Sequence, residues 1–236
     1  MMDLGNQRLL VISPHPDDEV IGCGGLIAKI KAHGGEVFVQ FLTVGDTNDA
    51  SATGFSSADE RHVEVERVAD LLQFDGYDVA FPGDDHHLLL DAIPQSAIIN
   101  TIERSGACSL EAVRPTIVAF PDSGSYNQDH RAAASAALAA LRPGDNRLRH
   151  QPAGVLIYEQ IADQWNAGFQ VMPSLAVELD ETHLSAKIEA MRTYKSQIRD
   201  HPSTRSPEAL EAMAFYRGAH FGCARAEAYK TLRWKV

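Results

Sequence analysis

Cysteine is scarce in this chain of 236 residues, which contains only Cys23, Cys108 and Cys223. The three are an odd number and form no CxxC pair, so they do not predict a disulfide framework. No apolar run is long enough to cross a membrane, and the N-terminal stretch lacks the basic and apolar regions of a signal peptide. These absences are typical of a cytoplasmic protein without membrane insertion.

Basic residues are also few, since 21 Lys and Arg stand against 32 Asp and Glu, for a net charge of −11. Nucleic-acid binding needs a basic face that neutralises phosphates, so the composition argues against it, and it disfavours adhesion to anionic lipid. The charge is compatible with a neutral or cationic small substrate, or with an anionic one met by a local arginine cluster. A homo-oligomer is compatible with the sequence as well.

The chain does contain short apolar runs that alternate with amphipathic stretches. The runs are continuous, as in strands buried on both faces, and the stretches between them are typical of helices. This succession predicts an α/β fold, a Rossmann-like, mostly parallel sheet with helices on both faces. The expected strands are 8–13, 36–43, 77–81, 116–120 and 154–159. The expected helices are a stretch around 24–35, then 58–74, 94–105 and 129–142.

The last third of the chain has a different pattern. Residues 174–179 read as a strand, and 180–197 and 206–222 read as helices. Asp180 or Thr182 is the expected cap of the first helix, and Ser206 followed by Pro207 marks the start of the second. We expect one domain over residues 1–236, with a core of about 1–160 and a C-terminal helical extension of about 161–236.

Acidic and imidazole side chains follow the expected strands again and again. The stretches are "PHPDDE" (14–19), "VGDTND" (44–49), "PGDDHH" (82–87), "PDSGSYNQDHR" (121–131) and "YEQ" (158–160). The carboxyl ends of parallel strands meet at one edge of a sheet, where ligands bind. A bound cation would compensate for such a gathering of polar groups. Imidazole and carboxylate ligands without thiolate suit Zn²⁺, with Fe²⁺ or Mn²⁺ as alternatives.

The stretch "PHPDDE" followed by "GCGG", together with "QDHR" at 128–131, resembles the PIG-L/LmbE-like zinc-dependent N-deacetylases. Weaker matches run over nearly the whole chain. The resemblance implies hydrolysis of N-acetyl groups on small-molecule amino sugars, with His15, Asp18 and His130 as metal ligands and Asp17 as general base. Three protein ligands leave a place for the water that a catalytic zinc needs.

The paired acids also suggest a local geometry. If residues 17 and 18 are extended, one side chain faces the metal and the next faces the reacting water. Glu19 and Asp129 are then expected to orient the imidazoles or the chain. The glycines of "GCGG" do not form a dinucleotide-binding GxGxxG, and close packing of a helix on a strand is the preferred interpretation.

One position departs from the family pattern, because many members have a His three residues before the last ligand. This chain has Asn127 there. An Asn amide can donate a hydrogen bond to an oxyanion but adds no charge and hands over no proton. We therefore expect Asn127 to contact the acetyl oxygen or the substrate, with the amine proton coming from Asp17 or from His86, His87 or His201.

Four further residues are candidates for substrate binding, each with a structural alternative. Asp46 either lines the pocket or caps a turn, and Arg61 either meets a site carboxylate or substrate or forms a surface ion pair. Glu159 lies beyond the fifth strand, and His201 lies in the extension, where packing is the alternative. His86 and His87 are expected mainly as exposed loop residues.

Two other functions remain as alternatives to the deacetylase. One is hydrolysis of another amide or ester on the same scaffold. The other is a non-catalytic module that binds a sugar or a metal, with Asn127 marking the loss of turnover. No pattern in the loops identifies the acceptor, whether a glycoside, a sugar nucleotide or a glycosylated natural-product precursor.

Overall fold

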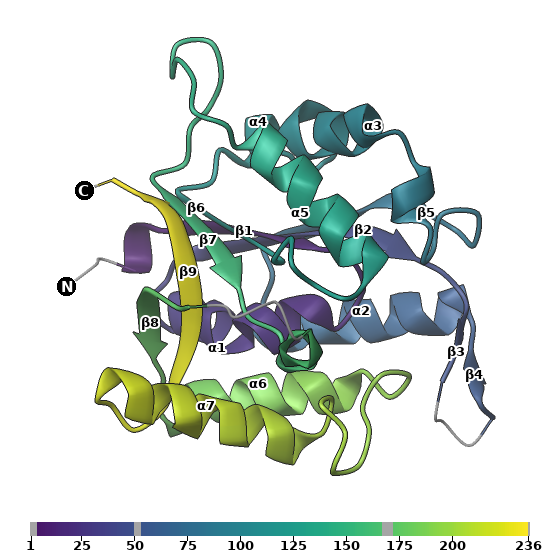
Figure 1. The fold of residues 1–236 in the computed structure, drawn as a ribbon, viewed down its shortest axis with the longest axis vertical. Helices are drawn as coiled ribbons and strands as arrows, with labels where there is room; N and C mark the ends of the chain where they lie inside the picture. Colours follow the sequence, from purple (N-terminus) through teal and green to yellow (C-terminus); the bar gives the residue numbers. More distant parts are fainter. Residues whose placement is uncertain (1–3, 50–52, 167–171, 236) are drawn as a thin grey trace.

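A seven-stranded sheet forms the centre of the computed structural model, which describes residues 4–49, 53–166 and 172–235. Its strands are β1 (Arg8–Ser13), β2 (Glu36–Val44), β5 (Gly76–Pro82), β6 (Ile117–Phe120), β7 (Gly154–Tyr158), β8 (Leu175–Glu178) and β9 (Ala226–Trp234). The order across the sheet is β5-β2-β1-β6-β7-β9-β8, visible in Figure 1. The first five strands in this order are parallel, as the continuous apolar runs predict. The fold class is confirmed.

Helices cover both faces of this sheet (Figure 1). On one side lie α1 (Asp18–Ala32), α2 (Ala58–Leu72), α6 (Glu181–Thr193) and α7 (Pro207–Phe221). On the other side lie α3 (Gln95–Asn100), α4 (Leu110–Val113) and α5 (Gln128–Ala140). The shorter elements are η1 (Leu4–Asn6), η2 (Leu90–Ala92), the π-helical turn η3 (Thr101–Ser105) and η4 (Ile161–Trp165), with the small hairpin of β3 (Thr47–Asn48) and β4 (Phe55–Ser56).

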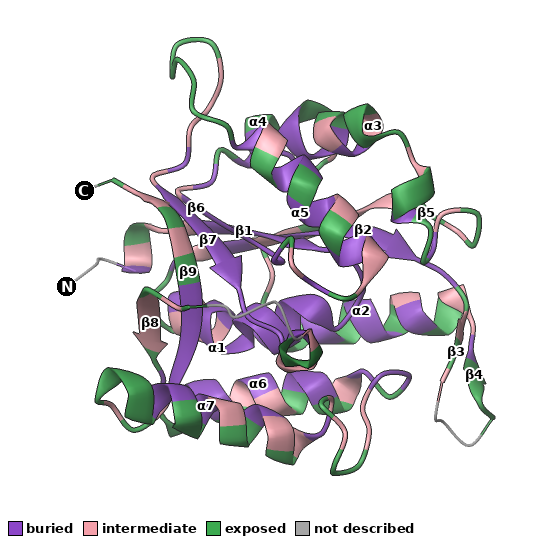
Figure 2. Cartoon of the chain, viewed as in Figure 1, coloured by how far each residue is buried: buried purple, intermediate pink, exposed green. Residues whose placement is uncertain are grey.

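The core is divided into two layers by the sheet, as the buried residues in Figure 2 show. Leu9 and Val11 of β1 belong to the cluster under α1, α2 and α6, whereas Leu10 and Ile12 belong to the cluster under α3 and α5. All four are fully buried. Alternate residues of one strand therefore fill both layers, and this explains why the strand sequence is apolar throughout.

The glycines after the first strand serve packing. A Cβ on Gly22 would lie 2.4 Å from a ring carbon of Tyr158 on β7, and one on Gly25 would lie 2.5 Å from Leu179. Only glycine lets α1 approach the sheet so closely. The sequence-based interpretation of "GCGG" as a packing device is confirmed, and α1 is thereby held with its first turn at the edge where β1 ends.

Two boundaries differ from the sequence-based expectation. Helix α1 begins at Asp18, well before residue 24, because the chain turns into a helix directly after "PHP". Strand β9 was not expected at all, and it pairs antiparallel with both β7 and β8. The C-terminal part thus adds α6 and α7 to one face and two strands to the sheet itself.

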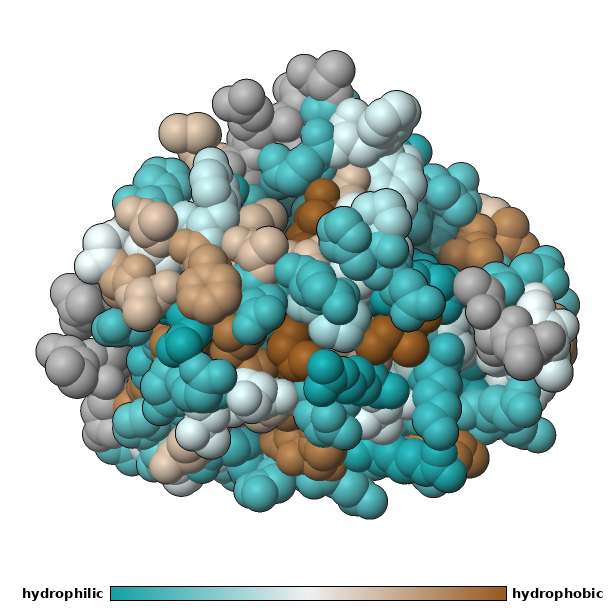
Figure 3. Space-filling view, turned by 90° about the horizontal axis from the view of Figure 1, so that it is seen from below, coloured by the Kyte–Doolittle hydropathy of each residue, from teal (hydrophilic) through white to brown (hydrophobic). Residues whose placement is uncertain are grey.

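The capping residues of the last two helices agree with the sequence. The side chain of Asp180 accepts a hydrogen bond from the backbone of His183, and that of Ser206 accepts one from Ala209, with Pro207 at the first helical position. Figure 3 shows that the face formed by α6 and α7 is mainly hydrophilic, with hydrophobic residues in small separate areas. Within the described ranges, no helix is both long and apolar enough to span a bilayer.

Candidate active site

Polar residues that follow the parallel strands converge at one edge of the sheet, as the strand-end pattern predicts. His15 and Asp18 come after β1, and His130 lies in the first turn of α5, which follows β6. All three are buried, and their ligand atoms lie within 4.8 Å of one another. The distant motifs "PHPDDE" and "QDHR" are therefore brought together in one cluster.

The distances from Asp18 to the two imidazoles fit a tetrahedral metal site. Asp18 Oδ2 lies 3.3 Å from His15 Nδ1 and 3.2 Å from His130 Nε2. Two ligands bonded to zinc at about 2.0–2.1 Å in a tetrahedron are themselves about 3.3 Å apart. Geometry and donor chemistry both fit a divalent metal ion.

Neighbouring side chains fix the orientation of these ligands. Asp129 Oδ2 accepts from His15 Nε2 at 2.8 Å, which leaves the lone pair on Nδ1, and Asp129 Oδ1 accepts from the backbone of Leu90 at 3.0 Å. Gln160 Nε2 donates to Asp18 Oδ1 at 2.6 Å. Such outer contacts hold the tautomer and the angle of a metal ligand. Asp129 takes the orienting position that the sequence predicts for it.

The electrostatics of the cluster favour a positive charge. Burial lowers the pKa of His15, but hydrogen bonds to Asp129 and Asp18 outweigh this effect and raise it to about 9. Burial raises the pKa of Asp18, yet the charge and hydrogen bond of His130 and the hydrogen bond of His15 hold it well below its usual value. Asp18 thus keeps its negative charge, and the carboxylates that stabilise a proton on His15 also stabilise a cation that replaces it.

Asp17 does not lie in an extended segment, so the predicted alternation of the two acids along a strand is wrong. Asp17 is the residue before α1, with φ 113° and ψ −30°, and Asp18 is the first helical residue. The two carboxylates diverge because the backbone turns there. A positive φ at a residue other than glycine costs of order 1–3 kcal/mol and persists where function or packing requires it.

One oxygen of Asp17 is chemically unsatisfied. Oδ2 is buried and accepts no hydrogen bond in the described chain, although Arg205 Nε lies 3.1 Å away. The contact is therefore an ion pair without hydrogen-bond alignment, and a lone pair is left for another donor. Burial raises the pKa of Asp17 to about 6, against the opposing charge of Arg205.

Asn127 caps α5, with its Oδ1 accepting a hydrogen bond from the backbone of Asp129 at 2.9 Å. The oxygen is thus engaged in the cap, and only the amide NH₂ can serve a ligand. Asn127 also lines a cavity of about 220 Å³ together with His130, Gln160 and Arg205. This position agrees with the expectation that Asn127 acts as a hydrogen-bond donor to substrate.

Arg61 and His87 lie behind the metal cluster, and both are buried. Arg61 Nη1 donates to His87 Nε2 at 2.8 Å and to the carbonyl oxygen of Gly45 at 3.0 Å, so Arg61 forms no surface ion pair. The His87 ring meets that of His15 edge-on, with centroids 5.6 Å apart. The expectation of an exposed His87 is wrong, because the loop after β5 folds inward and packs His87 against Gly45, which follows β2.

The remaining candidates lie at different depths. Asp46 is exposed, and its Oδ1 accepts from the backbone of Ala58 at 2.7 Å at the start of α2. Glu159 is buried in an ion pair with Arg217, whose Nε lies 2.8 Å from Oε2. His201 is exposed in the loop after α6. Their predicted substrate contacts stay predictions.

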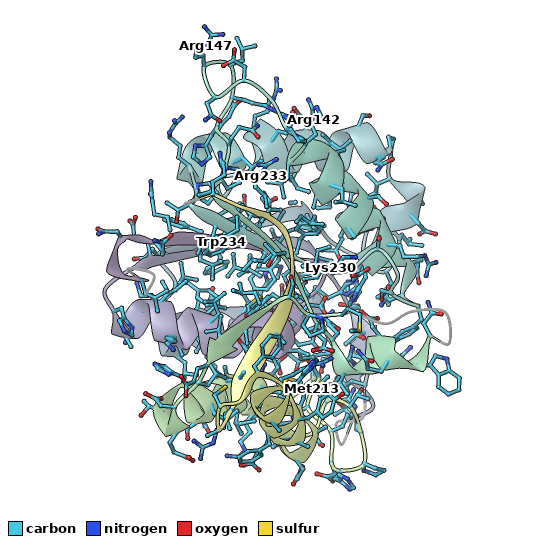
Figure 4. All side chains as sticks on the ribbon, turned by 60° about the vertical axis from the view of Figure 1, so that its left-hand side comes forward. Arg142, Arg147, Met213, Lys230, Arg233 and Trp234 are labelled. Atoms are coloured by element: carbon cyan, nitrogen blue, oxygen red, sulfur yellow. The ribbon has the colours of Figure 1, made fainter. Side chains whose placement is uncertain are left out.

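Sequence reasoning missed two residues of the site. Gln160 directly follows Glu159 at a strand end, so its position in "YEQ" was a usable signal. Arg205 had no such signal, because it reaches Asp17 through a loop whose path depends on the packing of α6 and α7. Met213 on α7 is labelled in Figure 4. It lines a small cavity together with Glu159 and Arg217.

Known proteins share both the sequence and the fold of this chain. Residues 10–141 match the PIG-L family, described as GlcNAc-PI de-N-acetylase. A diacetylchitobiose deacetylase of Thermococcus kodakarensis is 28% identical over 94% of this chain and 81% of its own length. The structure of an N,N'-diacetylchitobiose deacetylase from Pyrococcus horikoshii superimposes with a TM-score of 0.71 at 21% identity, covering 96% and 84% of the two chains.

The same fold also occurs with a different reaction. The structure of a 4-carboxy-2-hydroxymuconate hydratase from Pseudomonas putida matches with a TM-score of 0.67 at 18% identity, covering 98% of each chain. The architecture alone therefore does not determine the chemistry, and the site residues must carry the functional argument.

The mostly parallel α/β sheet, the two imidazoles and the carboxylate gathered at its carboxyl edge, and the match to known deacetylases together place the chain among the deacetylase hydrolases. More specifically, the chain belongs to the PIG-L family, whose match covers more than half of its length. The membership predicted from "PHPDDE" and "QDHR" is confirmed.

Proposed function

We propose that the protein is a zinc-dependent N-deacetylase that removes the acetyl group from an N-acetylated amino-sugar moiety. One observation carries the proposal: a buried Asp17 oxygen without a hydrogen-bond donor stands beside a three-residue cluster with the spacing of a metal site. The family description and the diacetylchitobiose deacetylase both name N-acetylated sugars, which supports this substrate class.

His15, Asp18 and His130 would hold the metal, with Asp129 and Gln160 orienting two of them. When bound, zinc supplies Lewis-acid polarisation of the acetyl carbonyl and lowers the pKa of water to about 7. The ligand set also accepts Fe²⁺ or Mn²⁺, which are the alternatives. Another neighbour of the same fold is described as a zinc-inhibited form of a teicoplanin deacetylase, so the amount of metal has to be controlled in any assay.

Asp17 acts as the general base in this mechanism. Its free Oδ2 lone pair accepts a proton from the attacking water, and the backbone conformation fixed by α1 keeps it in place. The same carboxyl then gives the proton to the amine as the C–N bond breaks, because an unprotonated amide anion is too poor a leaving group.

His87 is a poor candidate for that proton transfer. Arg61 donates to its Nε2, so this nitrogen carries no hydrogen, and burial together with the charge of Arg61 lowers the His87 pKa to about 4. His87 is therefore neutral at physiological pH. Its position indicates that it supports the ring of His15 instead of exchanging protons with substrate.

A screen for acetate release tests the proposal. The protein is depleted of metal, reloaded with one equivalent of Zn²⁺, Fe²⁺ or Mn²⁺, and assayed with N,N'-diacetylchitobiose, N-acetylglucosamine, its glycosides and its sugar nucleotides. We expect chelator-sensitive acetate release with at least one compound, lost in Asp17→Asn and retained in Asp70→Asn, which alters an exposed acid on α2. Full zinc occupancy without acetate from any compound would contradict the deacetylase function.

A further inference from the structure

Arg205 lies at the mouth of the site and is the residue that connects the loop after α6 to the reacting groups. Its Nε is 3.1 Å from Asp17 Oδ2, and its Nη1 donates to Gln197 Oε1 at 3.1 Å. Its Nη2 has no hydrogen-bond partner among residues 4–49, 53–166 and 172–235. The side chain is 41% exposed, whereas that of Asp17 is 2% exposed, so Arg205 spans from the buried base to the open cavity.

The cavity beside this arginine contains the other groups that substrate must meet. Its walls include Asn127 and His130 from one side and Arg199 and Arg205 from the other. Arg199 is committed to its own loop, because its Nη1 donates to the carbonyl oxygens of Ser196 at 2.9 Å and Ile198 at 2.7 Å. Arg205 is thus the cation that contacts the catalytic carboxylate.

The reaction develops negative charge within reach of this guanidinium. The water oxygen forms a bond to the acetyl carbon, and the carbonyl π electrons move to the oxygen, which becomes an oxyanion. That electron pair returns as the C–N bond breaks and the amine takes a proton from Asp17. A water held by Asp17 at hydrogen-bond distance attacks a carbon about 3–3.5 Å further on. A donor that touches Asp17 and faces the cavity can then reach the carbonyl oxygen.

We propose that Arg205 is a catalytic residue that donates a hydrogen bond from its guanidinium to the acetyl oxygen as this oxygen becomes negative. The inference rests on the proposed deacetylase function. It complements Asn127, whose amide supplies a donor but no charge in the wall of the same cavity. Arg205 supplies the missing charge from a different element, and its ion pair with Asp17 holds it at the site before substrate arrives.

Steady-state kinetics of Arg205→Ala and Arg205→Lys test this assignment, with Arg192→Ala, at an exposed arginine on α6, as the matched control. The substrate is whichever compound of the acetate-release screen the wild type turns over, beginning with N,N'-diacetylchitobiose. We expect Arg205→Ala to lower kcat by about 10²–10³-fold, the usual cost of losing an oxyanion donor. KM should change by less than about threefold, Arg205→Lys should recover part of kcat, and Arg192→Ala should stay within about threefold of the wild type.

Added guanidinium ion separates a catalytic from a purely structural role. It should restore part of kcat to Arg205→Ala but none to Asp17→Asn, while zinc content and Tm of the arginine variants match the wild type. A kcat for Arg205→Ala within threefold of the wild type, or a loss confined to KM, would overturn the proposal. Failure of the deacetylase function itself is recognised separately, because the wild type would then release no acetate.

Discussion

Two regions of this molecule bury acidic side chains, but they differ in how much positive charge surrounds them. Glu103, in the π-helical turn after α3, is 8% exposed and forms ion pairs with Arg104 at 3.0 Å, Arg142 at 2.6 Å and Arg149 at 3.2 Å. Figure 4 shows this region from the side, with Arg142 and Arg147 at the end of the molecule away from Met213. Three cations surround one carboxylate there.

At the carboxyl edge of the sheet, acidic side chains outnumber the arginines that contact them. Asp17, Asp18 and Asp129 are buried together with the imidazoles of His15 and His130, and the guanidinium groups that act on Asp17 are those of half-exposed Arg205 and buried Arg61. Burial raises the pKa of Glu103, but hydrogen bonds from Arg142 and Arg104 outweigh it and lower the pKa, whereas the pKa of Asp17 rises to about 6. A buried acid whose charge is neutralised by arginines stabilises the fold. A buried acid with too few cationic partners indicates that a bound cation or substrate completes the site.

Removing a metal ligand should have the largest effect. His130→Ala deletes the imidazole 3.2 Å from Asp18 and leaves the acids without the cation they require. We expect bound zinc to fall below one tenth of the wild type and kcat/KM to fall by about 10⁴-fold or more, because the metal supplies several kcal/mol of transition-state stabilisation. Elemental analysis and acetate release measure the two effects, and His33→Ala, at an exposed residue, is the control. Full zinc binding by His130→Ala would show that the cluster is not the metal site.

Neutralising Asp17 directly tests a buried acid with too few cationic partners. Asp17→Asn keeps the shape of the side chain but removes the basic lone pair, so kcat should fall by about 10³-fold while the zinc content stays at the wild-type level. The measurement is a comparison of acetate release with metal content in the same preparation. If zinc is lost together with activity, Asp17 contributes to metal binding and does not act as the general base.

Glu159 and Arg217 form a third case, a fully paired acid close to the site. Arg217→Met leaves the buried Glu159 carboxylate without its partner, and such a change costs about 3 kcal/mol or more. We expect a lower midpoint in urea unfolding, partial recovery in the double variant with Glu159→Gln, and a kcat within threefold of the wild type below the unfolding transition. A selective loss of kcat at unchanged stability would move this pair into the catalytic machinery.

The smallest effect is expected at Glu103. Glu103→Gln removes an acid whose arginine partners are partly exposed, so we expect a loss below about 1 kcal/mol at pH 7 and unchanged acetate release. Because the folded-state pKa is lowered, the stabilisation is present above the ordinary Glu pKa of about 4.3 and disappears as the pH falls below it. Urea unfolding at pH 7 and pH 3 should therefore show the variant and the wild type converging at the lower pH.

The gathering of His15, Asp18 and His130 was predictable because these residues belong to two short motifs at strand ends. The sequence indicates that β1 and β6 are parallel and buried, and parallel strands bring their carboxyl ends to one edge. His15, Asp18 and His130 then meet without any knowledge of the loops. The glycines of "GCGG" were predictable for a similar reason, since they lie on the helix that follows the first strand.

Other parts of the site depend on tertiary packing that no local pattern records. The inward fold of His87 follows from the loop after β5, and the reach of Arg205 follows from how α6 and α7 place their connecting loop. Strand β9 was missed because "AEAYKTLRW" mixes charged and apolar residues over a partly exposed strand. The division into a core of about 1–160 and an extension stays an interpretation, although β7 pairs directly with β9 across that boundary.

The position of β9 has a consequence for the order in which the protein matures. In the described chain, β8 pairs with β9 alone, and β9 lies between β7 and β8. On the ribosome, the residues up to His130 emerge early, but β8, which opens the segment that runs through α7, has no partner strand until residues 226–234 emerge. That segment contains Arg205 and Arg217. A nascent chain would therefore contain His15, Asp18 and His130 well before its sheet is complete, and docking of β9 would be the step that completes it.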